Sequence, residues 1–301
     1  MSVLVVGSVA LDYLETPFGV MEQALGGSAT FCSVAASYLT SDVRFVGIVG
    51  ADFPQKHIDF LTKRGIDLLG LVREAEGKTF SWGGKYHDDM NTRDTLYTEL
   101  GVFEHFQPAI PDAWKQSDFV LLGNIHPSLQ MEVLEQIEQP KLVVCDTMNL
   151  WINISQKDLK KVLKRVDVLI LNDEEARMLT DQRNLITAGN MLLRMGPRVA
   201  VIKKGEHGAV LMTRDTYFAS PAFPLETVKD PTGAGDTFAG AFVGWLARTG
   251  DVSTANMRKA VVYGSVLASF CVEEFSIDGI RALGEEHIAE RFSMFRKITT
   301  F

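Results

Sequence analysis

Short apolar runs rich in β-branched residues alternate along the chain with longer stretches whose apolar residues recur at helical spacing. Residues Val3–Val6 and Val43–Val49 are predicted as strands, and residues Thr30–Leu39 and Lys56–Arg64 as helices. The strand pattern resumes at Phe119–Leu122, Leu142–Cys145, Val168–Leu171 and Val199–Ile202. This alternation predicts an α/β fold with a doubly wound, mostly parallel sheet flanked by helices. In such sheets, ligands bind at the carboxyl ends of the strands.

One segment breaks this rhythm. From about residue 71 to residue 103, polar and aromatic residues alternate, which predicts antiparallel hairpin strands with a polar turn at 87–91. Together with a segment at about 10–27, it is expected to form a small β-sheet lid on a single domain spanning 1–301. A surface decoration is the alternative interpretation. Because exposed sheet edges favour pairing, a homodimer formed through the lid is also expected.

Composition restricts the class of protein. With 301 residues, 46% of them hydrophobic, the chain can bury a large core, and its net charge of −8 argues against nucleic-acid binding. The three cysteines are widely separated and form no CxxC pair, so neither a zinc site nor a disulfide framework is predicted. No apolar run is long enough to cross a membrane, and the N-terminal apolar run has the pattern of a strand rather than a signal peptide. We therefore expect a soluble, cytoplasmic protein.

The strongest local signal is KDPTGAGDTFAGAFVGWLA, residues 229–247. The glycines at 233 and 235 precede an apolar helical pattern, so the N–H groups of Gly233, Ala234 and Gly235 are predicted to converge on an anion at a helix start. Asp236 follows in the first helical turn, where its carboxylate can reach an attacking hydroxyl. An anion cradle beside a carboxylate base is what phosphoryl transfer requires. An ordinary helix-start aspartate is the alternative for the short motif taken alone.

The longer segment resembles the ribokinase or PfkB family of carbohydrate and nucleoside kinases. The family's signature reads approximately D-T-x-G-A-G-D-x-F, and residues 230–238 read DPTGAGDTF, which departs only at the second position. The resemblance implies a ribokinase-like fold, an alcohol phosphotransferase activity with Asp236 as the base, and ATP and Mg²⁺ as cofactors. It also implies a monovalent cation near Asp230 and Thr232 as a further candidate.

Three other motifs carry the same resemblance. Asp12 and the pair Gly26 and Gly27 match the family's acceptor-binding aspartate and its hinge between lid and body. Asn172 and Glu175 resemble the family's N-x-x-E, which implies phosphate binding by Asn172 and a water-mediated Mg²⁺ contact by Glu175. An Asn helix cap followed by a solvated Glu is the commoner meaning of that pattern. The nucleotide is implied to lie on the turn formed by Lys204, Gly205 and Gly208, close to Thr232.

The chain departs from the family pattern at Phe31, where many sugar kinases of this family have an acceptor-binding asparagine. An aromatic ring there either stacks on a sugar or nucleobase or packs inside the hinge. Asn124 and His126 follow a predicted strand and are candidate acceptor contacts, although a structural role for His126 is equally compatible. Arg93, in the predicted lid, is a candidate partner for an anionic group of the acceptor, and solvation is its alternative.

These observations lead to a kinase that phosphorylates a hydroxyl of a small sugar or related polyol. A nucleoside kinase is the alternative within the same chemistry, and a non-catalytic sugar or nucleotide sensor is the alternative from another class, because a fold alone does not guarantee chemistry. An NAD-linked oxidoreductase is disfavoured, since the first strand is followed by Gly7 without the G-x-G-x-x-G spacing.

Overall fold

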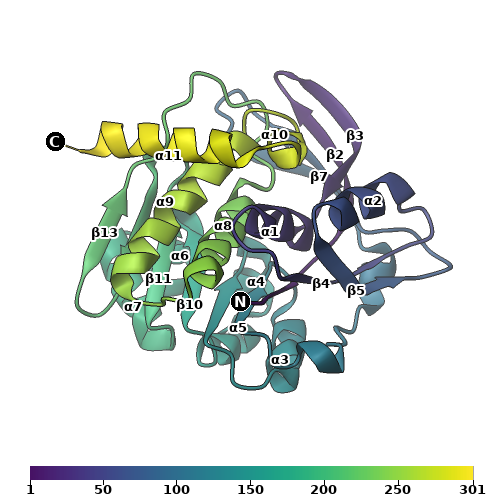
Figure 1. The fold of residues 1–301 in the computed structure, drawn as a ribbon, viewed down its shortest axis with the longest axis horizontal. Helices are drawn as coiled ribbons and strands as arrows, with labels where there is room; N and C mark the ends of the chain where they lie inside the picture. Colours follow the sequence, from purple (N-terminus) through teal and green to yellow (C-terminus); the bar gives the residue numbers. More distant parts are fainter. Residues whose placement is uncertain (301) are drawn as a thin grey trace.

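The computed structural model describes residues 1–300, which form a nine-stranded sheet with helices on both faces (Figure 1). The strand order is β13-β12-β11-β10-β9-β8-β1-β4-β5; the seven strands from β11 to β5 pair in parallel, whereas β12 pairs antiparallel with both β11 and β13. The bounds are β1 Val3–Val6, β4 Val43–Val49, β5 Ile66–Arg73, β8 Phe119–Leu122, β9 Leu142–Asp146, β10 Val168–Asn172, β11 Val199–Lys203, β12 Ala209–Met212 and β13 Tyr217–Ser220. The predicted doubly wound sheet is confirmed.

Three strands extend one residue beyond their predicted ends. The added residues are Asp146 on β9, Asn172 on β10 and Lys203 on β11, and each is polar. Apolar patterning could not include them, because it identifies only the part of a strand that is buried between helices. Polar side chains are therefore gathered at the carboxyl edge of three neighbouring strands.

The helices cover the two faces of the sheet. Their bounds are α1 Ser28–Ser37, α2 Gln55–Lys63, α3 Pro127–Gln136, α4 Asn149–Ile154, α5 Gln156–Leu163, α6 Asp173–Thr180, α7 Leu185–Met195, α8 Ala234–Thr249, α9 Thr254–Cys271, α10 Asp278–Arg281 and α11 Glu285–Thr299. Residues of β1 divide between two apolar cores, with Val3 and Val5 facing the core formed with α1, α8 and α9 and Leu4 and Val6 facing the core formed with α3 to α7. Period-two alternation along a fully buried strand produces this division.

A second sheet of four strands projects from the body. Its order is β3-β2-β6-β7, with bounds β2 Ala10–Thr16, β3 Gly19–Gly26, β6 Ser81–Tyr86 and β7 Arg93–Glu99. The β6–β7 pair is antiparallel, as predicted, but β2 and β6 pair in parallel. The predicted start at residue 71 differs from the structure, because residues 71–73 belong to β5 of the large sheet and continue its pairing with β4. The sequence does not separate β5 from the lid at this point, because polar and apolar residues alternate in both.

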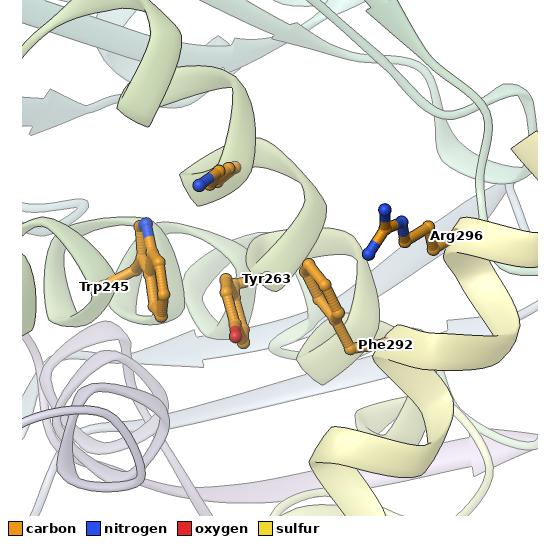
Figure 2. A pocket seen from close by; sticks show the side chains of 5 residues that line it. Trp245, Tyr263, Phe292 and Arg296 are labelled. Carbon is orange, nitrogen blue, oxygen red and sulfur yellow. The ribbon is translucent and has the colours of Figure 1, made fainter. Parts of the chain in front are cut away.

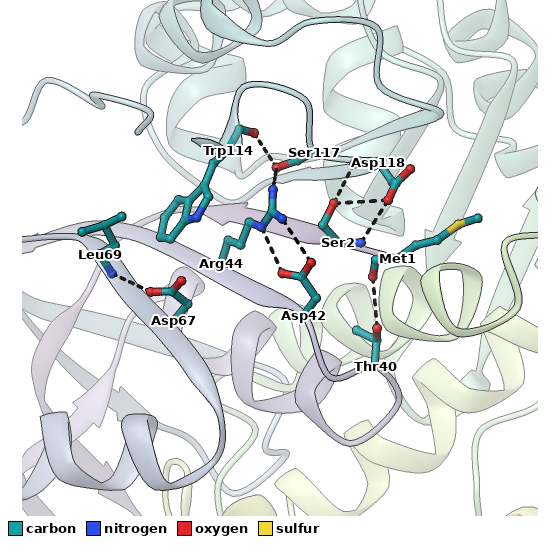
Figure 3. A network of polar contacts seen from close by, with 10 residues as sticks. All are labelled: Met1, Ser2, Thr40, Asp42, Arg44, Asp67, Leu69, Trp114, Ser117 and Asp118. Carbon is teal, nitrogen blue, oxygen red and sulfur yellow. Dashed lines mark hydrogen bonds and ion pairs between the residues drawn. The ribbon is translucent and has the colours of Figure 1, made fainter. Parts of the chain in front are cut away.

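The amino-terminal edge of the large sheet is closed by a polar network (Figure 3). Asp118, before β8, accepts hydrogen bonds from the N–H and the hydroxyl of Ser2 at 3.1 and 3.3 Å. Arg44 of β4 pairs with Asp42 at 3.0 Å and donates to the hydroxyl of Ser117 at 3.0 Å. These contacts join β1, β4 and β8 at one end, and the polar groups that make them are partnered within the protein.

Candidate active site

Helix α8 begins with a glycine in a conformation that other residues avoid. Gly233 caps the helix with φ of 75°, and a Cβ built on it would lie 2.4 Å from the ring of Phe31. Both the left-handed backbone and the close approach of the ring therefore require glycine. Phe31, on α1, thus lies directly beneath the turn that leads into α8.

The backbone N–H groups at this helix start differ from the predicted cradle. The N–H of Ala234 donates to the carbonyl of Pro231 at 3.2 Å, so it is not free to bind an anion in this structure. The first helical bond comes from Thr237, whose N–H donates to Gly233 at 2.8 Å. Within residues 1–300 the N–H groups of Gly233, Gly235 and Asp236 have no acceptor, as is usual in a first helical turn. The anion-binding groups available are therefore these three.

The carboxyl group of Asp236 lies in the first turn of α8. Its Oδ1 is buried and finds no hydrogen-bond partner within residues 1–300. The pKa of Asp236 is raised to about 7, because burial and the nearby carboxylate of Asp146 raise it more than the ammonium of Lys203 lowers it. A carboxyl group with a pKa near neutrality and a buried, unpartnered oxygen is suited to accept a proton.

Asp236 belongs to a cluster of four charged side chains, hereafter the charged cluster: Asp146, Glu175, Lys203 and Asp236. They come from the ends of β9 and β11 and the starts of α6 and α8. Lys203 Nζ lies 3.6 Å from Asp146 Oδ1, and the two side chains are 17% and 6% exposed. Burial lowers the pKa of Lys203, but the carboxylates of Asp146, Glu175 and Asp236 outweigh it, so the net shift is upward. The lysine is therefore charged.

Asn172 and Glu175 form a reciprocal cap at the start of α6. The Asn172 side chain accepts from the N–H of Glu175 at 2.8 Å, and Glu175 Oε2 accepts from the N–H of Asn172 at 2.8 Å. The helix-cap meaning of the sequence pattern is thus present, but Glu175 is buried rather than solvated. Burial raises its pKa to about 7, with Lys203 opposing and Asp146 adding to the shift.

Asp12 lies on the lid side of the site, on β2. Its Oδ1 accepts from the N–H of Trp82 on β6 at 3.1 Å, and a Cβ on Gly26 would lie 2.0 Å from its Oδ2. The pKa of Asp12 is raised to about 7 mainly by burial; the hydrogen bond from Trp82 lowers it, and the carboxylates of Asp230 and Asp236 raise it. Asp12 and Asp236 therefore lie close enough to repel each other, although Asp12 belongs to the small sheet and Asp236 to helix α8. Gly27, with φ of 92°, caps α1 beside them.

The structure supports the packing alternative for Phe31. The side chain is 1% exposed and its ring lies against Gly233 within the core beside α8. No face of the ring is available for stacking on an acceptor in this conformation. A sequence gives residue type and spacing but not burial, which is why both alternatives were open.

Two predicted acceptor contacts are already occupied by protein partners. The Asn124 side-chain oxygen accepts from Trp151 Nε1 at 2.8 Å. His126 caps α3, and its two ring nitrogens lie 2.8 Å from the hydroxyl of Ser128 and 2.9 Å from that of Ser155. The ring also packs edge-on against Trp151. This arrangement favours the structural alternative for His126.

The lid reaches the two turns at which nucleotide binding was predicted. The hydroxyl groups of Tyr86, on β6, and Thr232, before α8, are 3.1 Å apart. At the β6–β7 turn, Asn91 Oδ1 lies 3.4 Å from where a Cβ of Gly205 would stand. Lys204 and Gly208 flank Gly205 in the turn after β11, and Gly208 has φ of 84°. Arg93 is exposed, lies over the Trp82 ring and is close enough to Glu175 to lower its pKa.

Sequence reasoning missed Lys203 and chose its neighbour Lys204. The signal available was the position of Lys203 at the carboxyl end of a predicted strand, next to the turn motif. β11 ends at Lys203, and Lys204 already belongs to the following turn, where it caps the short 3₁₀ helix Gly205–His207. Which of the two lysines enters the charged cluster therefore depends on where β11 ends and the turn begins, which the sequence alone does not fix.

The small residues of α9 pack within the protein: a Cβ on Gly264 would lie 2.8 Å from the Phe238 ring of α8. A hollow of about 500 Å³ lies elsewhere, lined by Trp245, Lys259, Tyr263, Phe292 and Arg296 (Figure 2). The rings of Trp245, Tyr263 and Phe292 stack in series with centroids 4.1 and 4.5 Å apart, so they bind one another.

No group of three or more His, Cys, Asp or Glu side chains within residues 1–300 is arranged to hold a metal ion by itself. Among the helices of that same range, none combines the length and the apolar character needed to cross a membrane.

Comparison with known proteins gives consistent matches. Residues 3–279 match the sequence profile described as pfkB family carbohydrate kinase. A deoxyribokinase of Salmonella typhi is 34% identical over 84% of this chain and 84% of its own length. A cytidine kinase of Thermococcus kodakarensis is 28% identical over 82% of this chain and 89% of its own. An E. coli protein described as a ribokinase II, solved with ATP and Mg²⁺, matches with a TM-score of 0.79 at 17% identity over 99% of both chains.

Proposed function

The chain belongs to the pfkB family of carbohydrate kinases, and we propose that it transfers the γ-phosphoryl group of ATP to a hydroxyl of a small sugar or related polyol with Asp236 as the base. An ATP-dependent sugar or nucleoside kinase, and hence a phosphotransferase with an alcohol acceptor, follows from the family and its named relatives. The observation that carries the role of Asp236 is its buried, unpartnered Oδ1 beside free N–H groups at a helix start.

In the proposed reaction, the acceptor hydroxyl lies between Asp12 and Asp236. Asp236 takes the hydroxyl proton while the oxygen attacks the γ-phosphorus, and the N–H groups of Gly233, Gly235 and Asp236 stabilise the charge on the transferring group. Asp12 orients the acceptor by accepting hydrogen bonds from its hydroxyls. A pKa near 7 lets Asp236 accept a proton at neutral pH and still be ionised in much of the enzyme.

The residues around the site fit a magnesium nucleotide. Mg²⁺ prefers oxygen ligands and is usually held by phosphates, waters and one or two carboxylates, rather than by a complete protein cage. Glu175, through water, is the proposed carboxylate, and Asn172 supports the phosphates. When bound, Mg²⁺ neutralises phosphate charge. Lys204, Gly205, Gly208 and Thr232 are proposed to line the nucleotide, and backbone oxygens around Asp230 and Thr232 are the proposed place for a monovalent cation.

The small sheet is proposed to act as a lid over the acceptor. Tyr86 and Asn91 link it to the turns at Thr232 and Gly205, and Arg93 is placed to meet an anionic acceptor group. Closure would exclude water, which otherwise competes for the phosphoryl group. Val20 and Leu96 expose 54% and 48% of their surface on this sheet, which supports a homodimer formed through the lid. Light scattering of the wild type and Leu96→Glu tests it, and a monomeric wild type would contradict it.

A nucleoside is the second candidate acceptor. The half-buried aromatic side chain of Trp82 stands next to the acceptor-binding candidate Asp12, where it can stack on a base. The similarity to a cytidine kinase also supports this acceptor class. Burial of Phe31 and the higher identity to a deoxyribokinase favour the sugar.

Measuring ADP release with MgATP and a panel of sugars, sugar acids, polyols and nucleosides tests both candidates. We expect a sugar or polyol to give the highest kcat/KM, at least about tenfold above any nucleoside, which is a difference of about 1.4 kcal/mol in transition-state binding. A nucleoside that exceeds every sugar would replace the first candidate with the second. Acceptor-dependent ADP release from none of these compounds would favour a sensor instead.

A further inference from the structure

The ammonium group of Lys203 makes only a long contact with an acidic side chain within residues 1–300. Its only ion pair within residues 1–300 is with Asp146, at 3.6 Å. Several surface lysines of the same chain are much closer to their partners, such as Lys161 to Asp158, Lys115 to Asp112 and Lys229 to Glu274, each at 2.7 Å. A charge-assisted hydrogen bond is normally 2.7–2.9 Å long. A lysine buried only to neutralise Asp146 would be expected at that shorter distance.

The ammonium group stands directly over the start of α8. A Cβ built on Gly235 would lie 2.7 Å from Lys203 Nζ, so the absent side chain is what leaves room for it. The N–H groups of Gly235 and Asp236 lack acceptors within residues 1–300, and Asp236 Oδ1 is also unpartnered. One ammonium and two free N–H groups therefore border the same small space as the proposed base.

The ammonium group of Lys203 and the N–H groups of Gly235 and Asp236 all need a hydrogen-bond acceptor, and no well-placed acceptor lies within residues 1–300. One ammonium and two backbone N–H groups border the space, while the carboxylates of the charged cluster make it unfavourable for an anion unless a cation stands there. A tetrahedral group with several non-bridging oxygens satisfies an ammonium and two amides at once. A transferring phosphoryl group has that form, and its charge is spread over three oxygens.

We propose that Lys203 is a further catalytic residue, whose ammonium binds a non-bridging oxygen of the γ-phosphoryl group. This rests on the proposed function. The bond from the acceptor oxygen to the γ-phosphorus forms as the bond to the β,γ-bridging oxygen breaks, and the bonding electron pair leaves with ADP. The acceptor proton goes to Asp236, while Lys203 keeps its protons and supplies charge only. Lys203, rather than the adjacent Lys204, is thus the lysine at the transferred group.

Titration calorimetry with MgADP and with magnesium β,γ-imido-ATP, which carries an uncleavable γ-phosphoryl group, tests the assignment. Lys203→Met should weaken binding of the imido nucleotide at least tenfold and change MgADP binding less than threefold. Lys203→Arg, which keeps the charge, should fall between Lys203→Met and wild type. As the control, Lys161→Met removes a lysine of α5 and its ion pair with Asp158. Its affinity for each nucleotide should equal that of wild type. With an acceptor from the panel, kcat of Lys203→Met should fall at least 100-fold.

Equal weakening of both nucleotides in Lys203→Met, or no weakening of either, would overturn the assignment. A thermal melt identifies a variant that fails to fold, and Lys203→Arg and Lys203→Gln then carry the comparison. Failure of the proposed function looks different, because the wild type itself would release no ADP with any acceptor. The two ideas can therefore fail separately.

Discussion

Polar residues at the amino-terminal edge of the large sheet are paired within the protein, whereas important ones at the carboxyl edge are not. At the amino-terminal edge, Ser2, Arg44 and Asp118 are paired within the protein at about hydrogen-bond distance. At the carboxyl edge, Asp236 Oδ1 has no partner within residues 1–300 and Lys203 has only a long contact with Asp146. Since an unpaired buried polar group costs free energy, such groups persist mainly where a ligand completes them.

The carboxyl edge is not uniform, however. At the end of β8, Asn124 and His126 are as fully partnered as the residues of the amino-terminal edge. Position at a strand end therefore selects candidates, and unmet hydrogen bonding separates those that await a ligand from those that hold the fold.

The largest effect is expected for Asp236→Asn. Loss of the base should lower kcat by a factor on the order of 10³ or more, as for other catalytic groups. The melting temperature should not fall, because the change removes a carboxylate that faces Asp146 and Glu175. ADP release with the acceptor found in the panel measures the rate, and nucleotide binding by calorimetry is the control. A rate within about tenfold of wild type would refute the role.

The pH dependence is expected to follow the carboxyl groups of the site. Asp236 has a pKa of about 7 in the folded protein, so kcat should fall about tenfold per unit below pH 7 as the base is protonated. Asp12 and Glu175 also have a pKa of about 7. These groups bind more protons folded than unfolded between pH 4 and 7, so the free energy of unfolding of the ligand-free protein should decrease as pH rises through that window.

A pH–rate profile and urea unfolding at several pH values measure the two effects. Asp236→Asn should show a smaller decrease in stability between pH 4 and 7, because one of the three groups is gone. A wild-type rate that stays constant down to pH 5 would contradict the assignment of a base with a raised pKa.

Gly233→Ala should have an intermediate effect. A left-handed alanine costs about 1–2 kcal/mol, and its Cβ would also meet the Phe31 ring, so the turn and the N–H groups after it must shift. We expect activity to fall by about tenfold or more. Gly65→Ala is the matched control, since φ is 78° there and nothing lies within 4 Å of the added Cβ. It should lose stability and keep activity, and equal activity losses in both variants would show that strain alone is responsible.

His126→Ala should change kcat/KM by less than about threefold. The variant loses the cap of α3 and its contacts with Ser128 and Ser155, so the free energy of unfolding should fall by about 1 kcal/mol. Urea unfolding and initial rates check the two values. A loss of activity above about 100-fold without a loss of stability would place His126 at the acceptor and break the distinction within the carboxyl edge.

The smallest effect on activity is expected for Asp118→Ala at the amino-terminal edge. Removal of the carboxylate leaves the N–H of Ser2 unpaired, which should lower the free energy of unfolding by about 1–3 kcal/mol. Rates measured well below the melting temperature should equal those of wild type. A change in kcat would mean that the two edges are coupled through the sheet.

The sequence predicted the elements of the body well because their burial imposes a strong pattern. Residues Val3–Val6 and Phe119–Leu122 are strands with those bounds, and α1 and α2 lie within two residues of their predictions. The antiparallel β12 and β13 were not predicted. The boundary between β5 and the lid was also missed, because alternation continues across it.

The sequence by itself determined the parallel α/β plan and the glycine-rich start of α8 with Asp236 in its first turn, since apolar periodicity and glycine conformation act locally. Only the tertiary structure decided that Lys203 rather than Lys204 faces the charged cluster and that Phe31 is buried under Gly233. It also decided that Asn124 and His126 are already partnered. Each of these depends on which distant residues meet across the sheet, and spacing along one chain does not encode that meeting.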